Sequence, residues 1–107
     1  MGQFVIACYR PKPGKEADLL AEVQAHLPTL RGQGLVTDRP PYAMRAADGS
    51  IVEVFEWQSE AAVNAAHSNP VVLAMWGRFG GCCEMVSLRT LAETEGPFPH
   101  FEPVEVC

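Results

Sequence analysis

The feature that most constrains the fold is the stretch at residues 52–79, which reads VEVFEWQSEAAVNAAHSNPVVLAMWGRF. It begins as a β-strand, and Ser59 can then cap a helix whose first residue, Glu60, suits the positive end of the helix dipole. Asn69-Pro70 restarts the helix, because Asn caps helices and Pro is favoured at the first helical position. This order brings aromatic and histidine side chains to one apolar cleft. We therefore predict a small-molecule pocket lined by Trp57, His67, Trp76 and Phe79.

Hydrophobic periodicity and turn residues predict the other elements. Residues 3–9 form a continuous apolar run typical of a central strand, and residues 15–31 carry a helical apolar stripe. Asp48-Gly49 is a strong hairpin signal between two strands. The full prediction is a strand, a helix, two strands, two helical segments and a strand, at residues 3–9, 15–31, 42–46, 51–57, 60–67, 70–79 and 83–88.

This order is β-α-β-β-α-β, which predicts an α+β, ferredoxin-like fold in which a four-stranded antiparallel sheet carries its helices on one face. In the first and third predicted strands, apolar residues occur at both odd-numbered and even-numbered positions, which face opposite sides of the sheet. Helices on one face would leave half of those residues exposed, so we expect a second copy to pack sheet to sheet in a symmetric homodimer. We assign residues 1–90 to this domain, and residues 91–107 to a C-terminal tail that packs on the domain or on the dimer partner.

Charge and length exclude several classes of partner. The chain has 107 residues and a formal net charge of −5. It has no basic cluster, so we expect neither nucleic acid nor a membrane as a partner. No run approaches the about 18 apolar residues of a membrane span, and the N-terminus lacks the pattern of a secretory signal. The expected compartment is the cytoplasm.

The cysteines do not predict a metal site. They stand at positions 8, 82, 83 and 107, without C-x-x-C spacing or a second pair that would complete a zinc site. We expect reduced and mostly buried thiols, with Cys82 and Cys83 on opposite faces of a strand. A redox or nucleophilic role for Cys83 is the alternative, and Cys107 is expected to be exposed.

A set of short motifs carries a resemblance to a known family. They are a strand ending in an aromatic residue, two helix starts and a later phenylalanine: Phe55-Glu56-Trp57, Ser59-Glu60-Ala61, Ala66-His67, Asn69-Pro70 and Phe79. Over residues 3–90 the chain resembles the dimeric α+β barrel superfamily, and within it the antibiotic-biosynthesis-monooxygenase-like group. Asn69 stands where the family pattern has a serine, and both residues cap helices. The resemblance implies a dimeric barrel formed by two sheets.

The family resemblance also implies a range of activities. Members of the group include cofactor-independent oxygenases acting on aromatic polyketides and quinones, haem-degrading enzymes, and proteins without known activity. If the chain is such an oxygenase, a base removes a phenolic proton and the electron-rich carbanion then reduces dioxygen, without metal or flavin. The alternatives are a non-catalytic stress-related or ligand-binding dimer and a haem-binding or haem-degrading protein. The first predicted strand lacks the asparagine that the haem-degrading members carry there, and His67 is the only candidate haem ligand.

His67 is the candidate catalytic residue, because a neutral imidazole can accept a proton near pH 7. The alternative is a histidine that only bonds a carbonyl group at the end of its helix. The residues expected to bind substrate, as apolar walls or as partners of substrate oxygens, are Trp57, Trp76, Phe79, Tyr42, Arg45 and Tyr9. The alternative for the tryptophans is a place in the core.

The acidic residues of the third predicted strand are further candidates. Glu53 or Glu56 could act as a base if buried beneath the helices. An ion pair with Arg45 across the hairpin is the simpler interpretation. We interpret His26, at the edge of the first helical stripe, and His100, in the tail, as structural residues.

Overall fold

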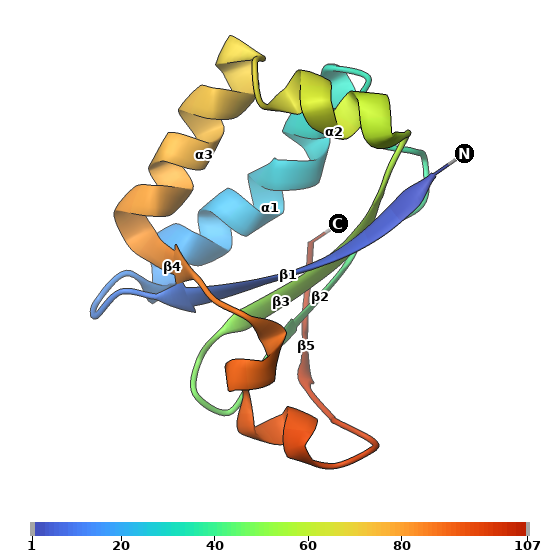
Figure 1. Ribbon diagram of the computed structural model, residues 1–107. Helices are drawn as coiled ribbons and strands as arrows, with labels where there is room; N and C mark the ends of the chain where they lie inside the picture. The colour runs from blue at the N-terminus through green and yellow to red at the C-terminus, as the bar shows by residue number, and fades with distance from the viewer. Residues whose placement is uncertain (1, 107) are drawn as a thin grey trace.

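A computed structural model, which describes residues 2–106, shows one antiparallel sheet and three α-helices (Figure 1). The strands are β1 (Gln3–Pro11), β2 (Tyr42–Arg45), β3 (Ile51–Trp57), β4 (Cys83–Met85) and β5 (Glu102–Val104). The α-helices are α1 (Glu16–Gly32), α2 (Glu60–Ala66) and α3 (Pro70–Cys82), and two short 3₁₀ turns, η1 (Leu88–Thr90) and η2 (Ala92–Glu95), follow β4. The predicted α+β class is confirmed.

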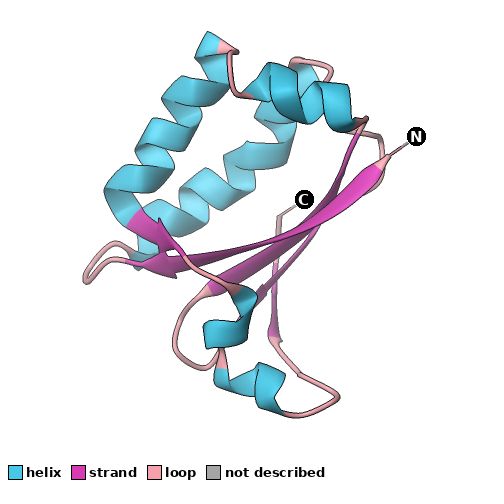
Figure 2. Cartoon of the chain, viewed as in Figure 1, coloured by secondary structure: helices cyan, strands magenta, loops and turns pink. Residues whose placement is uncertain are grey.

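The sheet has the strand order β4-β1-β3-β2-β5, and α1, α2 and α3 lie together on one of its faces (Figure 2). β1 and β3 are its central strands, with Ala7 opposite Glu53 and Tyr9 opposite Ile51. Successive side chains of a strand point to opposite faces of the sheet. Phe55, two residues along from Glu53, therefore shares its face with Glu53.

The prediction of a four-stranded sheet is wrong, because the tail supplies a fifth strand. β5 pairs antiparallel with β2, placing Pro103 opposite Met44 and Glu102 opposite Arg45. β5 lies at the edge of the sheet, where proline is tolerated because its missing N–H breaks no inner ladder. β5 has only three residues and proline at its centre. Neither feature gives a strand signal in the sequence.

The local signals around the second half of the chain act as predicted. The Ser59 hydroxyl accepts a hydrogen bond from the backbone N–H of Ala62 at 3.1 Å, and α2 begins there. The Asn69 side chain accepts from the N–H groups of Val71 and Val72, and Pro70 opens α3. Cys82 is the last residue of α3 and Cys83 the first of β4, so the prediction that both belong to one strand is wrong.

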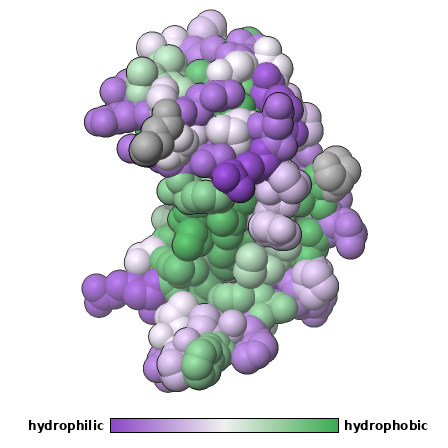
Figure 3. All heavy atoms as spheres, turned by 90° about the vertical axis from the view of Figure 1, so that its right-hand side faces the viewer, coloured by the Kyte–Doolittle hydropathy of each residue, from purple (hydrophilic) through white to green (hydrophobic). Residues whose placement is uncertain are grey.

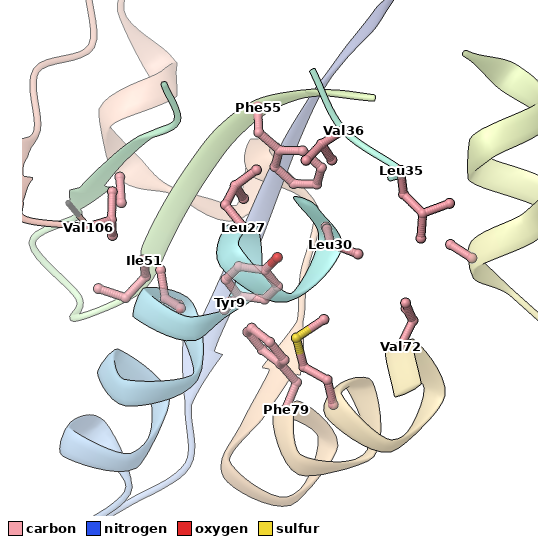
Figure 4. Packing of buried hydrophobic residues seen from close by; sticks show 14 of the residues in the cluster. Tyr9, Leu27, Leu30, Leu35, Val36, Ile51, Phe55, Val72, Phe79 and Val106 are labelled. Carbon is pink, nitrogen blue, oxygen red and sulfur yellow. The ribbon is translucent and has the colours of Figure 1, made fainter. Parts of the chain in front are cut away.

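The main core lies between the sheet and the helices. α1 contributes Leu19, Leu27 and Leu30, all nearly inaccessible to solvent, and α3 contributes Met75 and Phe79. Figure 4 shows Tyr9 of β1, Leu27 of α1 and Phe79 of α3 pointing toward one another in this layer. The layer fixes how α1 and α3 sit above β1 and β3, and therefore which of their side chains meet.

The opposite face of the sheet is only partly covered by the chain itself. Leu91 of the tail is buried there against Cys8 and Val52. Farther along β1 and β2, Phe4, Ile6 and Tyr42 are 63%, 54% and 67% exposed. Figure 3 shows hydrophobic residues gathered in a hollow between two more hydrophilic parts of the surface. We call Phe4, Ile6 and Tyr42 the open-face patch.

Candidate functional site

A cavity of about 350 Å³ lies beside the part of β1 that β4 does not pair with. Most of its walls are apolar, and the side chains with nitrogen or oxygen atoms come from β1, β3, α1, α3 and the end of α2. The apolar side chains include Val5, Ala7, Phe55 and Met85, and the side chains with nitrogen or oxygen atoms are Tyr9, His26, Trp57, His67 and Trp76. Ligand pockets typically combine apolar walls with a few convergent polar groups.

A chain of hydrogen bonds runs from the cavity wall into the core. The Trp76 indole N–H donates to His26 Nε2 at 3.2 Å, and His26 Nδ1 lies 2.7 Å from Glu53 Oε1. The Tyr9 hydroxyl donates to the same Glu53 oxygen at 2.9 Å. His26, Glu53 and Tyr9 are 3%, 1% and 4% exposed. We call His26 and Glu53 the His26–Glu53 pair.

The indole of Trp76 fixes the protonation pattern of His26. An indole N–H can only donate, so Nε2 of His26 must accept and cannot carry a proton. A neutral imidazole then has its proton on Nδ1, which donates to the Glu53 carboxylate. A carboxylate that receives Nδ1–H orients the ring and makes Nε2 a better acceptor. Nε2, the acceptor atom, belongs to a residue of the cavity wall.

Tyr9 stays protonated beside this carboxylate. Burial, and next the Glu53 carboxylate, raise the pKa of the Tyr9 phenol above its usual value. A neutral hydroxyl remains available as a donor to Glu53. Tyr9 therefore acts in this network as a buried donor that helps to satisfy Glu53, and not as a source of phenolate.

His67 occupies the exposed rim of the cavity. Its Nδ1 lies 2.8 Å from the carbonyl oxygen of Val63, one turn earlier. A carbonyl can only accept, so Nδ1 carries the proton and Nε2 of the neutral ring keeps a free lone pair. The His67 ring meets the Trp76 ring edge-on, with centroids 5.2 Å apart. Trp76 therefore contacts both cavity histidines.

The cavity includes several of the residues predicted from the sequence. Trp57, His67, Trp76 and Tyr9 line it. Phe79 lies in the core beneath, with its ring 4.9 Å from that of Tyr9 and 5.0 Å from that of His26. The open-face residue Tyr42 and the β2 residue Arg45 lie outside the cavity lining.

The predicted ion pair between Glu53 and Arg45 is wrong. Arg45 stands opposite Ile51 on one side and Glu102 on the other, and its guanidinium lies 3.3 Å from Glu102. Glu53 points to the helix side and meets His26. Glu56, on the other face, receives hydrogen bonds from the Thr37 hydroxyl and Arg39.

The His26–Glu53 pair was not predicted from the sequence. A signal for Glu53 was present, because it occupies the same parity as the apolar residues Ile51, Phe55 and Trp57 of β3. A signal for His26 was its spacing within the buried stripe of α1. Neither signal tells which strand residue lies under which helix residue, and that contact depends on the tertiary structure.

The cysteines are far less suited to react than these imidazoles. Burial raises the pKa of the Cys83 thiol to about 11, so it is protonated at neutral pH. Cys8, Cys82 and Cys83 are free and buried, and Cys107 lies outside the described residues. Within residues 2–106 no cluster of three or more His, Cys, Asp or Glu side chains could hold a metal ion.

None of the helices within residues 2–106 is long and apolar enough to cross a membrane. Comparison of the chain with models of protein families, with curated proteins and with solved structures finds no significant match.

Proposed function

We propose that the protein is a small-molecule-binding member of the dimeric α+β barrel superfamily, and that it is a cofactor-independent monooxygenase acting on an aromatic or quinone-like substrate. The observation that carries the proposal is the apolar cavity of about 350 Å³, whose wall contains two imidazoles, each with one unprotonated ring nitrogen. Pockets for small ligands begin at about 300 Å³. Its volume and apolar walls suit a bicyclic aromatic molecule.

Two features support the barrel part of the proposal. The strands β4-β1-β3-β2 follow the order of a ferredoxin-like sheet, with the helices on one face. The open-face patch of Phe4, Ile6 and Tyr42 leaves large apolar side chains in water. A second copy of this chain, packed sheet to sheet, would bury that patch. We propose this homodimer as the working form of the protein.

The proposed chemistry uses His67 as the base. Nε2 of His67 is free to take a phenolic proton, and its exposed position lets the proton pass to solvent. The electron-rich phenolate carries negative charge on a ring carbon and passes an electron to dioxygen. Recombination forms a carbon–oxygen bond, and the hydroperoxide then loses water to give a quinone. One oxygen atom of dioxygen ends in the quinone and the other in water, and the substrate supplies all the electrons.

The cavity volume favours a ligand smaller than haem. At about 350 Å³ it lies near the lower end of the range for ligand pockets, about 300–1,000 Å³, and is small for a porphyrin. No step of the proposed reaction therefore involves haem.

The test is oxygen uptake and formation of a hydroxynaphthoquinone from a dihydroxynaphthalene with one hydroxyl group on each ring, measured against the rate without protein. This product has one oxygen atom more than the substrate, so its formation reports transfer of oxygen. We expect turnover by the protein as purified, and its loss in His67→Ala. His100→Ala is the matched control, because His100 is an exposed histidine of the tail. Full turnover in His67→Ala would show that His67 is not the base. Binding of the dihydroxynaphthalene without any turnover would favour the non-catalytic ligand-binding alternative.

A further inference from the structure

The interior end of the cavity has a polar group that the proposed reaction does not use. Nε2 of His26 is a lone-pair acceptor in an apolar wall, and the indole of Trp76 is its hydrogen-bond partner. His26 is 3% exposed, whereas Trp76 is only partly buried and lies beside the exposed His67. The acceptor is therefore the more deeply buried member of this hydrogen bond, and its donor is the more accessible one.

Three buried contacts fix His26 in this role. The ring donates from Nδ1 to Glu53 at 2.7 Å, and it packs edge-on against Phe55 and Phe79 with centroids 5.4 and 5.0 Å away. Glu53 also receives the Tyr9 hydroxyl. A proton on Nε2 would meet the indole N–H head-on. The lone pair on Nε2 is thus preset before any ligand arrives.

We infer that His26 is the specificity-determining residue of the cavity, because its Nε2 accepts a hydrogen bond from a hydroxyl group of the ligand. Without ligand the Trp76 indole N–H donates to Nε2, and the ligand hydroxyl displaces this N–H. The inference rests on the cavity of the proposed function but not on its chemistry. His67 at the rim exchanges the proton, and His26 at the interior end recognises the hydroxyl.

The charges around the site define the class of ligand. A donor is required at Nε2, so a phenol fits and its methyl ether does not. The Glu53 carboxylate lies behind His26, and the cavity lining within the described residues contains no lysine or arginine. A carboxylate at Nε2 of His26 would meet a buried negative charge without a counter-charge, whereas the phenolate of the proposed reaction forms beside the protonated His67 at the rim. The ligand is therefore a neutral hydroxylated aromatic molecule and not an aromatic carboxylate.

The experiment compares three probes of nearly equal size by isothermal titration calorimetry: naphthol, its methyl ether methoxynaphthalene, and naphthoate. One net hydrogen bond is worth about 2-fold to 10-fold in affinity. In the unmodified protein the ligand hydroxyl gains the bond to Nε2 while the Trp76 indole loses it, so we expect naphthol to bind tighter than the ether by about 2-fold, the lower end of that range. Naphthoate should bind at least as weakly as the ether. Equal affinity of naphthol and the ether would overturn the inference while leaving the cavity intact. No binding of any probe would overturn the proposed pocket as well.

Substitutions of the two tryptophans test whether the Trp76 indole N–H competes with the ligand hydroxyl for His26. Trp76→Phe removes the competing N–H, so naphthol should bind about 2-fold to 10-fold tighter relative to methoxynaphthalene. Trp57→Phe is the matched control, because Trp57 is the other indole of the cavity lining and does not bond His26. It should change the affinity for both probes alike. An unchanged preference in Trp76→Phe would contradict the displacement.

The paired change His26→Leu with Glu53→Leu removes the acceptor together with the buried carboxylate, so that neither is left alone in the core. We expect this variant, once circular dichroism shows that it is folded, to bind naphthol and methoxynaphthalene equally. A retained preference for naphthol would overturn the assignment to His26. If the variant does not fold, the Trp76→Phe result decides.

Discussion

Replacing Glu53 by leucine tests whether the hydrogen-bond network stabilises the fold. The change leaves the Tyr9 hydroxyl and His26 Nδ1–H without their acceptor, and both groups are almost wholly buried. An unsatisfied buried donor costs about 1–3 kcal/mol, so the two together cost about 2–6 kcal/mol. Removing a buried carboxylate and adding apolar surface offset part of that cost. We expect Glu53→Leu to lower the free energy of unfolding by about 2–4 kcal/mol.

The assay is urea unfolding at neutral pH, followed by circular dichroism at a fixed protein concentration. Glu53→Gln keeps a carbonyl oxygen as an acceptor and should lose less stability than Glu53→Leu. Glu56→Gln is the matched control, since Glu56 lies on the other face of β3 and its partner Arg39 is exposed. Its cost should stay within about 1 kcal/mol, as for surface ion pairs. A Glu53→Leu variant as stable as the unmodified protein would refute the reasoning.

Three further predictions concern other parts of the molecule. The raised pKa of Tyr9 stabilises the fold below the unfolded value of about 10, and this contribution is lost as pH rises further. Tyr9→Phe should therefore flatten the decline in unfolding free energy above pH 10, and an unchanged decline would contradict this role of Tyr9. Ile6→Glu, which puts a charge in the open-face patch, should convert the proposed dimer to a monomer in light scattering, and a dimer that persists would contradict the sheet-to-sheet arrangement. Leu91→Ala deletes a buried tail side chain and should cost about 2–5 kcal/mol of stability, whereas the control Leu73→Ala, 46% exposed, should cost far less, and equal costs would contradict the docking of the tail.

Sequence patterns predicted those parts of the fold whose causes are local. The caps Ser59 and Asn69 satisfy orphan N–H groups within their own helices, and Asp48-Gly49 turns the chain between adjacent strands. These signals need no knowledge of the rest of the molecule. Strand β5 depends instead on the free edge of β2, far away in the sequence. Its three residues carry too little periodicity to identify a strand.

In the candidate site, too, some residues could be predicted from the sequence and others could not. Trp57, His67 and Trp76 could be placed near one cleft because they belong to consecutive elements. The His26–Glu53 pair depends on how α1 crosses β3, and periodicity gives the inward face of each element but not their relative register. A charged residue at an inward position of an apolar strand was the available clue. It indicates a buried partner without naming which helix supplies it.

The most direct test of the site is a nitrogen–proton correlation spectrum of the indole N–H groups during titration with naphthol. The chain has two tryptophans, Trp57 and Trp76, so two indole signals are expected, and the two phenylalanine variants assign them. We predict that naphthol shifts the Trp76 signal in step with binding, because the Trp76 N–H leaves His26. Methoxynaphthalene should shift this signal less. A Trp76 signal that stays in place while naphthol saturates the protein would contradict the account.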